Sequence, residues 1–175
     1  MVSDFNKYVL PYLRNFIKIN IDYSQLKKID DCAFKLLNVS DFGKLNDKYD
    51  GQLFYQKFKN QTLAEIAVEK FFKESFIDWE QKKANVNYKP KFFRAGDYYG
   101  IISAPFGELP MVTSDSGEKI VVCFIADKKT VWLSGIINTN DENVKFIPPS
   151  FFLAESNYRG YLSSFNLMSP LESII

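Results

Sequence analysis

The sequence predicts an α+β fold in which N-terminal helices precede a mostly antiparallel or mixed central sheet flanked by helices. Two observations predict it. Apolar residues recur at helical spacing up to about residue 75, and runs rich in Val, Ile and aromatic residues begin near residue 85. Neither a repeat nor a linker interrupts the 175 residues. We therefore expect a single domain over residues 1–175, helical over residues 1–75 and sheet-rich over residues 85–165.

Two helices are expected in the first forty residues. Ser3 can cap the first helix, and Pro11 kinks it or starts a second turn. The second helix is predicted over 22–38, "DYSQLKKIDDCAFKLLN", because Leu26, Ile29 and Ala33 recur at helical spacing. The face expected for the first helix consists of Phe5, Val9, Leu13, Phe16 and Ile17.

A third helix is predicted from "TLAEIAVEKFF", after a loop over Val39–Gly51 that is rich in Asp, Asn and Gly. Thr62 followed by Glu65 matches a capping box, in which the hydroxyl accepts one free helix amide and the glutamate accepts the amide of the cap residue. Glu69 is expected to form an ordinary exposed pair with Lys73 one turn later.

The sheet-rich region begins with "NVNYKPKFF", where Pro90 favours an edge strand or a bulge, and continues with "YYGIISA". The runs "KIVVCFIA" and "KTVWLSGII" are joined by Asp127 and Lys128 and predict a hairpin. Ile120 to Ile125 is apolar at every position, so this strand should be covered on both faces. A short strand in "VKFIPP" and a helix start at "SPLES", capped by Ser169, complete the chain.

Composition excludes several kinds of chemistry. The chain contains no histidine, so a Ser-His-Asp triad, a Cys-His pair, a His-ligated zinc and a histidine general base are impossible within it. The two cysteines, Cys32 and Cys123, are far apart in apolar patterns and are expected to be small buried side chains. The formal net charge of +1 argues against nucleic-acid binding through overall charge, though not against a local basic patch.

No apolar run approaches the roughly 20 residues that cross a bilayer. The N-terminal stretch has an early aspartate and no uninterrupted apolar core, so we expect no signal peptide, no membrane partner and a cytoplasmic location.

Together, "TLAEIAVEKFF", "AGDYYGIIS" and "VVCFIADKKTVWLSGII" resemble the PD-(D/E)xK, or restriction-endonuclease-like, superfamily over roughly residues 60–165. The resemblance implies a restriction-endonuclease-like fold and a Mg²⁺-dependent nuclease site. In such a site carboxylates hold the metal beside the scissile phosphate, and a lysine positions the attacking water.

Carried onto this sequence, the resemblance makes Glu65 the helix glutamate and Asp97 the metal-binding aspartate, and these two are the candidate catalytic residues. The Glu-x-Lys motif is degenerate, because Ile101 and Ser103 occupy its positions. The next acid is Glu108, which together with Asp97 is the candidate metal ligand. Its lysine position is Pro110, so the catalytic lysine is absent from the matched strand.

Each acid also has a structural explanation. The capping box accounts for Glu65, a turn or strand end accounts for Asp97, and a solvated loop accounts for Glu108.

One stretch favours nucleic acid. Residues 82–94, "KKANVNYKPKFFR", combine cations with aromatic residues and contain no acid, which is the pattern of single-strand binding surfaces. The alternative is an edge strand whose lysines discourage aggregation while its aromatic residues face the core. The candidate DNA-binding residues are Lys82, Lys83, Lys89, Lys91 and Arg94.

The function expected from these observations is a divergent nuclease-fold protein, catalytically impaired, that binds DNA in a phage, mobile-element or restriction context. If it is an enzyme, it is a Mg²⁺-dependent nuclease. The alternative is a non-enzymatic protein-interaction domain, with a homo-oligomer as one form of it, which the many aromatic residues would support.

Overall fold

The structure, a computed structural model, describes residues 2–45, 49–90, 92–149 and 157–175. Its α-helices run over α1 (Val2–Tyr8), α2 (Tyr23–Leu37), α3 (Tyr49–Phe72) and α4 (Trp79–Ala84). Short 3-10 helices are η1 (Leu10–Asn15), η2 (Phe42–Leu45), η3 (Ser114–Ser116), η4 (Phe165–Leu167) and η5 (Leu171–Ile174). The fold is α+β, as the sequence predicts. None of the helices in the described ranges is long and apolar enough to cross a membrane.

Two sheets follow from the pairing of the strands. The larger is mixed, in the order β1-β6-β5-β3-β2; β3 runs parallel to β5, and its other pairs are antiparallel. The smaller sheet has the order β4-β8-β7. The strands are β1 (Ile17–Asn20), β2 (Phe92–Arg94), β3 (Asp97–Pro105), β4 (Met111–Thr113), β5 (Lys119–Ile125), β6 (Thr130–Asn138), β7 (Phe146–Ile147) and β8 (Tyr158–Leu162).

The hairpin predicted from the two apolar runs is present as β5 and β6. The carboxylate of Asp127 closes its turn by accepting the amides of Lys129 and Thr130, each at 2.8 Å. Farther along, the register shifts next to Gly135, whose φ is +136° and where a Cβ would meet the carbonyl oxygen of Ser169 at 2.6 Å. Glycine is required there because any side chain would collide with the segment around Ser169, which forms an antiparallel bridge with Ile136 of β6.

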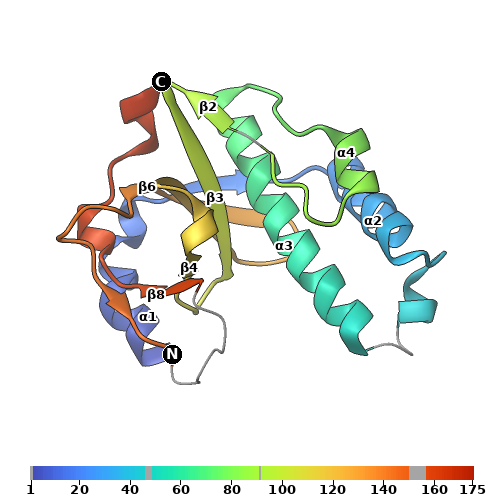
Figure 1. The fold of residues 1–175 in the computed structure, drawn as a ribbon, viewed down its shortest axis with the longest axis horizontal. Coiled ribbons are helices and arrows are strands. Elements are labelled where there is room, and N and C mark those ends of the chain that lie inside the picture. Colours follow the sequence, from blue (N-terminus) through green and yellow to red (C-terminus); the bar gives the residue numbers. More distant parts are fainter. Residues whose placement is uncertain (1, 46–48, 91, 150–156) are drawn as a thin grey trace.

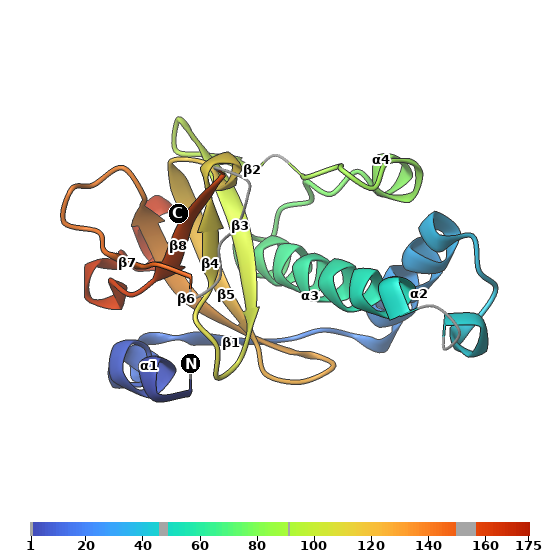
Figure 2. The same cartoon turned by 60° about the horizontal axis from the view of Figure 1, so that its bottom comes forward.

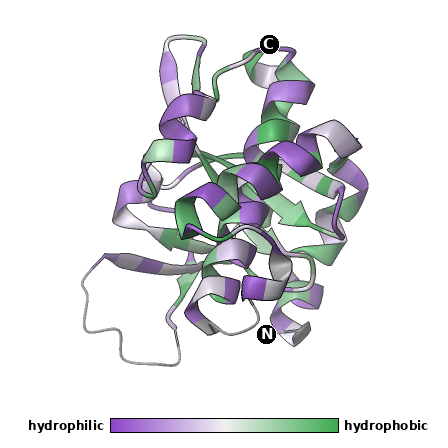
Figure 3. Ribbon diagram, turned by 90° about the vertical axis from the view of Figure 1, so that its right-hand side faces the viewer, coloured by the Kyte–Doolittle hydropathy of each residue, from purple (hydrophilic) through white to green (hydrophobic). Residues whose placement is uncertain are grey.

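The larger sheet separates two hydrophobic cores. Val121, Cys123 and Ile125 of β5 join the core under α2 and α3, whereas the alternate residues of β5, among them Phe124, join the core under α1. Figure 2 shows α2, α3 and α4 on one side of the sheet and α1 on the other. In Figure 3 the outward positions of the helices are hydrophilic and the strands behind them are hydrophobic. The expected burial of 120–125 on both faces is confirmed, as is the burial of both cysteines.

Several local predictions are wrong. Ser3 lies inside α1, which begins at Val2, and therefore does not cap it. Ile17 lies in β1 and pairs with Leu133 of β6 instead of extending the first helix. Thr62 does not start a helix: α3 begins at Tyr49, and the Thr62 hydroxyl donates to the carbonyl of Phe58 at 2.7 Å inside that helix. At "SPLES" the chain forms only the 3-10 helix η5, with Pro170 in place of Ser169 at its N-cap.

The predicted Glu69–Lys73 pair is also replaced by another contact. One carboxylate oxygen of Glu69 accepts the amides of Phe76 and Ile77, at 2.7 and 2.8 Å, beyond the C-terminus of α3. Lys73 adopts a left-handed conformation, with φ of 56°, that ends the helix. Glu69 therefore fixes the direction in which the chain leaves α3.

Candidate functional site

A cavity of about 900 Å³ lies beside β3 from Asp97 to Ser103. Gln61 and Glu65 of α3 form one wall, β3 residues from Asp97 to Ser103 form the floor, and the segment from Thr113 to Lys119 forms the opposite wall. Figure 1 shows α3 along one side of β3, with β4 on its other side. The cavity therefore brings together the helix and the strand that the family resemblance singled out.

Glu65 is held in this wall by its place on α3. It lies one turn after Gln61, so both side chains project from the same side of the helix toward β3. The Gln61 side-chain amide donates to the Glu65 carboxylate at 3.2 Å and to the carbonyl of Ile101 at 2.8 Å. The residue as a whole is only 1% exposed, so the Glu65 carboxylate needs a partner within the protein.

That partner is Lys82 of α4. Its ammonium forms an ion pair with the Glu65 carboxylate. Asp78 caps α4 by accepting the amides of Glu80 and Gln81, each at 3.0 Å, and so fixes the short helix that presents Lys82. Burial raises the pKa of the Glu65 carboxyl, and the Lys82 ammonium opposes that rise.

Asp97 begins β3 and forms an ion pair with Lys119, which begins β5. The parallel pairing of β3 with β5 brings these strand starts to the same end of the sheet. The hydrogen bond from Lys119 to Asp97 raises the pKa of the Lys119 amine. Both side chains are more than a third exposed, so water screens this pair far more than it screens Glu65 and Lys82.

The third ion pair in the cavity joins Lys89 to Asp115 at 2.6 Å. The hydrogen bond from Lys89, followed by that from the Thr113 hydroxyl, lowers the pKa of Asp115. This pair connects the chain before β2 to η3, and both residues line the cavity.

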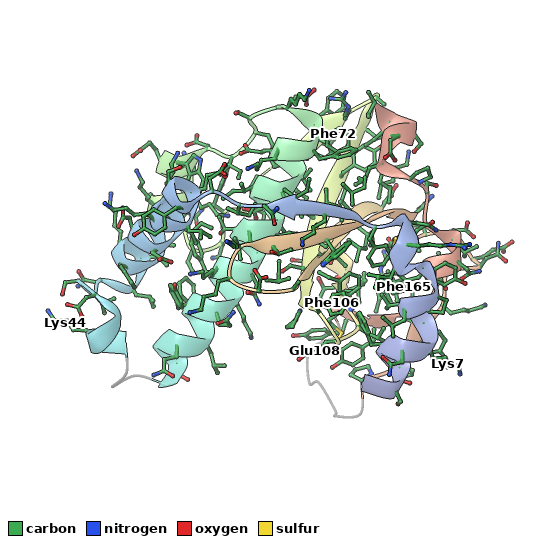
Figure 4. All side chains as sticks on the ribbon, turned by 180° about the vertical axis from the view of Figure 1, so that it is seen from behind. Lys7, Lys44, Phe72, Phe106, Glu108 and Phe165 are labelled. Carbon is green, nitrogen blue, oxygen red and sulfur yellow. The ribbon has the colours of Figure 1, made fainter. Side chains whose placement is uncertain are left out.

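Glu108 lies elsewhere. It follows the far end of β3, and the nine residues of that strand span roughly 26 Å at about 3.3 Å per residue. Figure 4 shows Glu108 beside Phe106, at the end of the molecule opposite Phe72, a residue that packs against Phe92 near the start of β3. The structure therefore brings Glu65 and Asp97 to one cavity but does not bring Glu108 to Asp97.

The donor set does not fit a bound Mg²⁺ as it stands. Glu65 and Asp97 each face a lysine ammonium where a metal would need free carboxylate oxygens. Within the described ranges no three acidic or cysteine side chains are grouped closely enough to hold a metal ion. Ile101 and Ser103, in the positions of the Glu-x-Lys motif, also line this cavity and supply neither a carboxylate nor an amine.

The cations predicted to bind nucleic acid already have acidic partners. Lys82 is buried on Glu65, Lys83 pairs with Glu80 at 2.9 Å, and Lys89 pairs with Asp115. Arg94 pairs with Glu74 and donates to the carbonyl of Ile174 at 2.7 Å. Lys91 lies outside the described residues. The aromatic residues of this stretch differ in burial: Phe92 is in the core, whereas Phe93 is 53% exposed.

The polar residues of the cavity that sequence reasoning did not identify include Gln61, Asp115, Glu118 and Lys119. A signal existed for Gln61, an amide one turn before Glu65 and therefore on the same face of a helix that contains both. The contacts of Asp115 and Lys119 depend on β3 pairing in parallel with β5, which no local pattern indicates.

No protein-family model matches the chain, and neither the curated proteins nor the solved structures yield a match.

Proposed function

We propose that this chain is a divergent nuclease-fold protein that has lost metal-dependent cleavage and acts by binding. Glu65 and Asp97 line one cavity together with Ile101 and Ser103 of β3, and this placement supports the kinship that the sequence resemblance implies. The restriction-endonuclease-like relationship and the phage, mobile-element or restriction context belong to this proposal, as does a cytoplasmic location.

One observation carries the loss of catalysis: the Lys82 ammonium contacts the buried Glu65 carboxylate. A cation supplied by the protein already neutralises the acid that would otherwise attract Mg²⁺. Removing it would leave a buried charge without a partner, which costs several kcal/mol. The absence of a lysine at Ser103 removes the group that would position the attacking water.

DNA is the ligand that the resemblance implies, and we expect its binding to be weak. Lys83, Lys89 and Arg94 would each have to exchange a carboxylate for a phosphate. Such an exchange gains little electrostatic energy, so affinity should be no tighter than the roughly 10⁻⁶ M typical of non-specific binding and should fall steeply with salt.

A nicking assay on supercoiled plasmid DNA in Mg²⁺ and in Mn²⁺ tests the proposal, with Glu65→Ala and Asp97→Ala as matched controls. We expect wild type and both variants to give the same background nicking. Metal-dependent nicking by the wild-type protein that either variant abolishes would contradict it. Fluorescence anisotropy with labelled single- and double-stranded oligonucleotides at increasing salt measures the expected weak binding.

A non-enzymatic protein-interaction function is the second candidate, and a specific observation favours it. Phe93 and Tyr98 form an exposed pair on the β2–β3 hairpin, 53% and 66% exposed, with ring centroids 4.7 Å apart. Exposed aromatic residues are enriched in protein interfaces. Sedimentation velocity over a range of concentrations tests whether this surface joins copies of the chain, and Tyr98→Ser should abolish any self-association found.

A further inference from the structure

The outer edge of β3 lacks a strand partner over most of its length. β2 pairs with β3 only from Asp97 to Tyr99, whereas β5 pairs with the other edge from Tyr99 to Pro105. Across the described residues, no strand lies on the outer edge of β3 from Gly100 to Pro105. Such an edge presents a row of backbone donors and acceptors that another strand can pair with.

The direction of these groups follows from two hydrogen bonds. The carbonyl of Ile101 accepts the Gln61 side-chain amide at 2.8 Å on the outer edge, whereas the Phe106 amide donates to Ile125 of β5 on the inner edge. Alternate residues of a strand direct their backbone groups to the same side. The backbone N–H and C=O groups of Ile101 and Ser103 therefore point to the outer edge of β3. The Gln61 side-chain amide bonds the Ile101 carbonyl in the position that a backbone amide of an added strand would take.

The outer edge of β3 lies at the bottom of the cavity, between two walls. Gln61 and Glu65 of α3 lie on one side of it, and Ser116 of η3 lies so close on the other that a Cβ at Gly100 would collide with its carbonyl oxygen. A single extended segment can enter between these walls. The edge strand of a second folded copy would bring its own sheet and covering helix, and these would meet α3 and η3.

The charge of the cavity indicates which kind of extended segment it can bind. Among the described residues, its lining contributes four carboxylates, Glu65, Asp97, Asp115 and Glu118, against two ammonium groups, Lys89 and Lys119. Glu65, Asp97 and Asp115 are paired with Lys82, Lys119 and Lys89, so in the part of the chain that the structure describes the negative charge in excess is that of Glu118. This balance disfavours the phosphates of a nucleic acid and favours a segment that carries lysine or arginine.

We propose that this cavity binds an extended basic peptide segment of a partner protein, which adds a strand to the outer edge of β3. Backbone hydrogen bonds to Ile101 and Ser103 hold the segment in register, and a Lys or Arg side chain of the segment meets Glu118 at the wall. The segment either displaces the Gln61 amide or pairs beside it. The inference rests on the protein-interaction function proposed above and makes its partner specific.

Backbone amide NMR on the full chain tests the proposal. The probes are short blocked peptides in which Lys or Arg alternates with Val, Ile or Thr. We expect hydrogen exchange at Ile101 and Ser103 to slow on peptide binding, because these amides gain partners. The amides of Ile102 and Ala104, which face β5, serve as the internal control and should not change. The same peptides methylated at alternate backbone nitrogens should bind at least about tenfold more weakly.

Charge is tested with one pair of variants. Glu118→Lys should weaken peptide binding several-fold, whereas Glu108→Lys, at the far end of β3 and outside the cavity, should not. Equal affinity for the methylated peptides would overturn the proposal, as would a failure of every peptide to slow exchange at Ile101 and Ser103. Concentration-dependent protection without peptide would assign the edge to a second copy instead. Peptide binding that perturbs only Phe93 and Tyr98 would overturn this inference yet leave the interaction function standing.

Discussion

Lys82 and Glu65 form an ion pair whose side chains are only 4% and 2% exposed, although it joins two helices that are separate in the sequence. The stem of Lys82 brings its ammonium within 5.3 Å of the Phe58 ring centroid and 5.9 Å of that of Tyr88. Water therefore cannot replace either partner. The pair attaches α4 to the cavity wall. Removing one of its two charges should therefore lower the free energy of unfolding of the whole protein.

We expect Lys82→Met to destabilise the protein by about 3–5 kcal/mol, because it leaves the Glu65 carboxylate buried without a cation. The double variant Glu65→Gln with Lys82→Met should recover most of this loss, since no charge is then left unpaired. Urea unfolding of the wild type, Lys82→Met, Glu65→Gln and the double variant gives the coupling free energy. Lys83→Met is the matched control, since its pair with Glu80 is exposed, and it should change the unfolding free energy little. Additive effects of the two buried substitutions would contradict the expected coupling.

The stability of Lys82→Met should depend on pH in a defined direction. Burial already raises the pKa of Glu65, and loss of the ammonium raises it further. A carboxyl whose folded pKa exceeds its unfolded value of about 4.3 binds its proton more tightly when folded. The variant should thus be most stable relative to wild type at low pH and lose stability as pH rises through the folded pKa. Urea midpoints measured from about pH 4.5 to about pH 8 check this, and the double variant with Glu65→Gln should show no such trend.

Glu69 should stabilise the end of α3 through its two backbone contacts. Glu69→Ala removes the acceptor of the Phe76 and Ile77 amides and should cost about 1–3 kcal/mol, whereas Glu69→Gln keeps an acceptor oxygen and should cost less. Thermal or urea unfolding measures both. Lys73→Ala should have little effect. A loss from Lys73→Ala as large as that from Glu69→Ala would instead support an ion pair between these residues.

The elements of the fold that local pattern specifies were predictable. The hairpin β5–β6 and helix α2 follow from runs of apolar residues with the period of a strand or a helix, and these periods are independent of the rest of the chain. The start of α3 was not predictable in this way. Thr62 and Glu65 match a capping box, yet Thr62 bonds back to Phe58, because the preceding residues are already helical.

The site was predictable only to a limited extent, since its contacts cross elements. Glu65 and Asp97 could be selected by residue type, but their lysine partners could not, because Lys82 comes from α4 and Lys119 from β5. The stretch from Lys82 to Arg94 contains no acid in its own sequence, which suggested free cations. Its acidic partners, Glu65, Glu74, Glu80 and Asp115, all lie outside that stretch.

Gly100 should control the distance between β3 and the opposite wall of the cavity. A Cβ there would collide with the backbone carbonyl of Ser116, and a backbone atom cannot rotate away as a flexible side chain can. Gly100→Ala should therefore push η3 outward and cost about 1–3 kcal/mol, the range for overpacked positions. Ser103→Ala on the same strand is the control, because its hydroxyl makes only a 3.3 Å contact with Gln61. Urea unfolding measures the cost, and exchange of the Ser116 amide reports the displacement of η3. An unchanged stability together with an unchanged exchange rate would show that η3 does not press against β3.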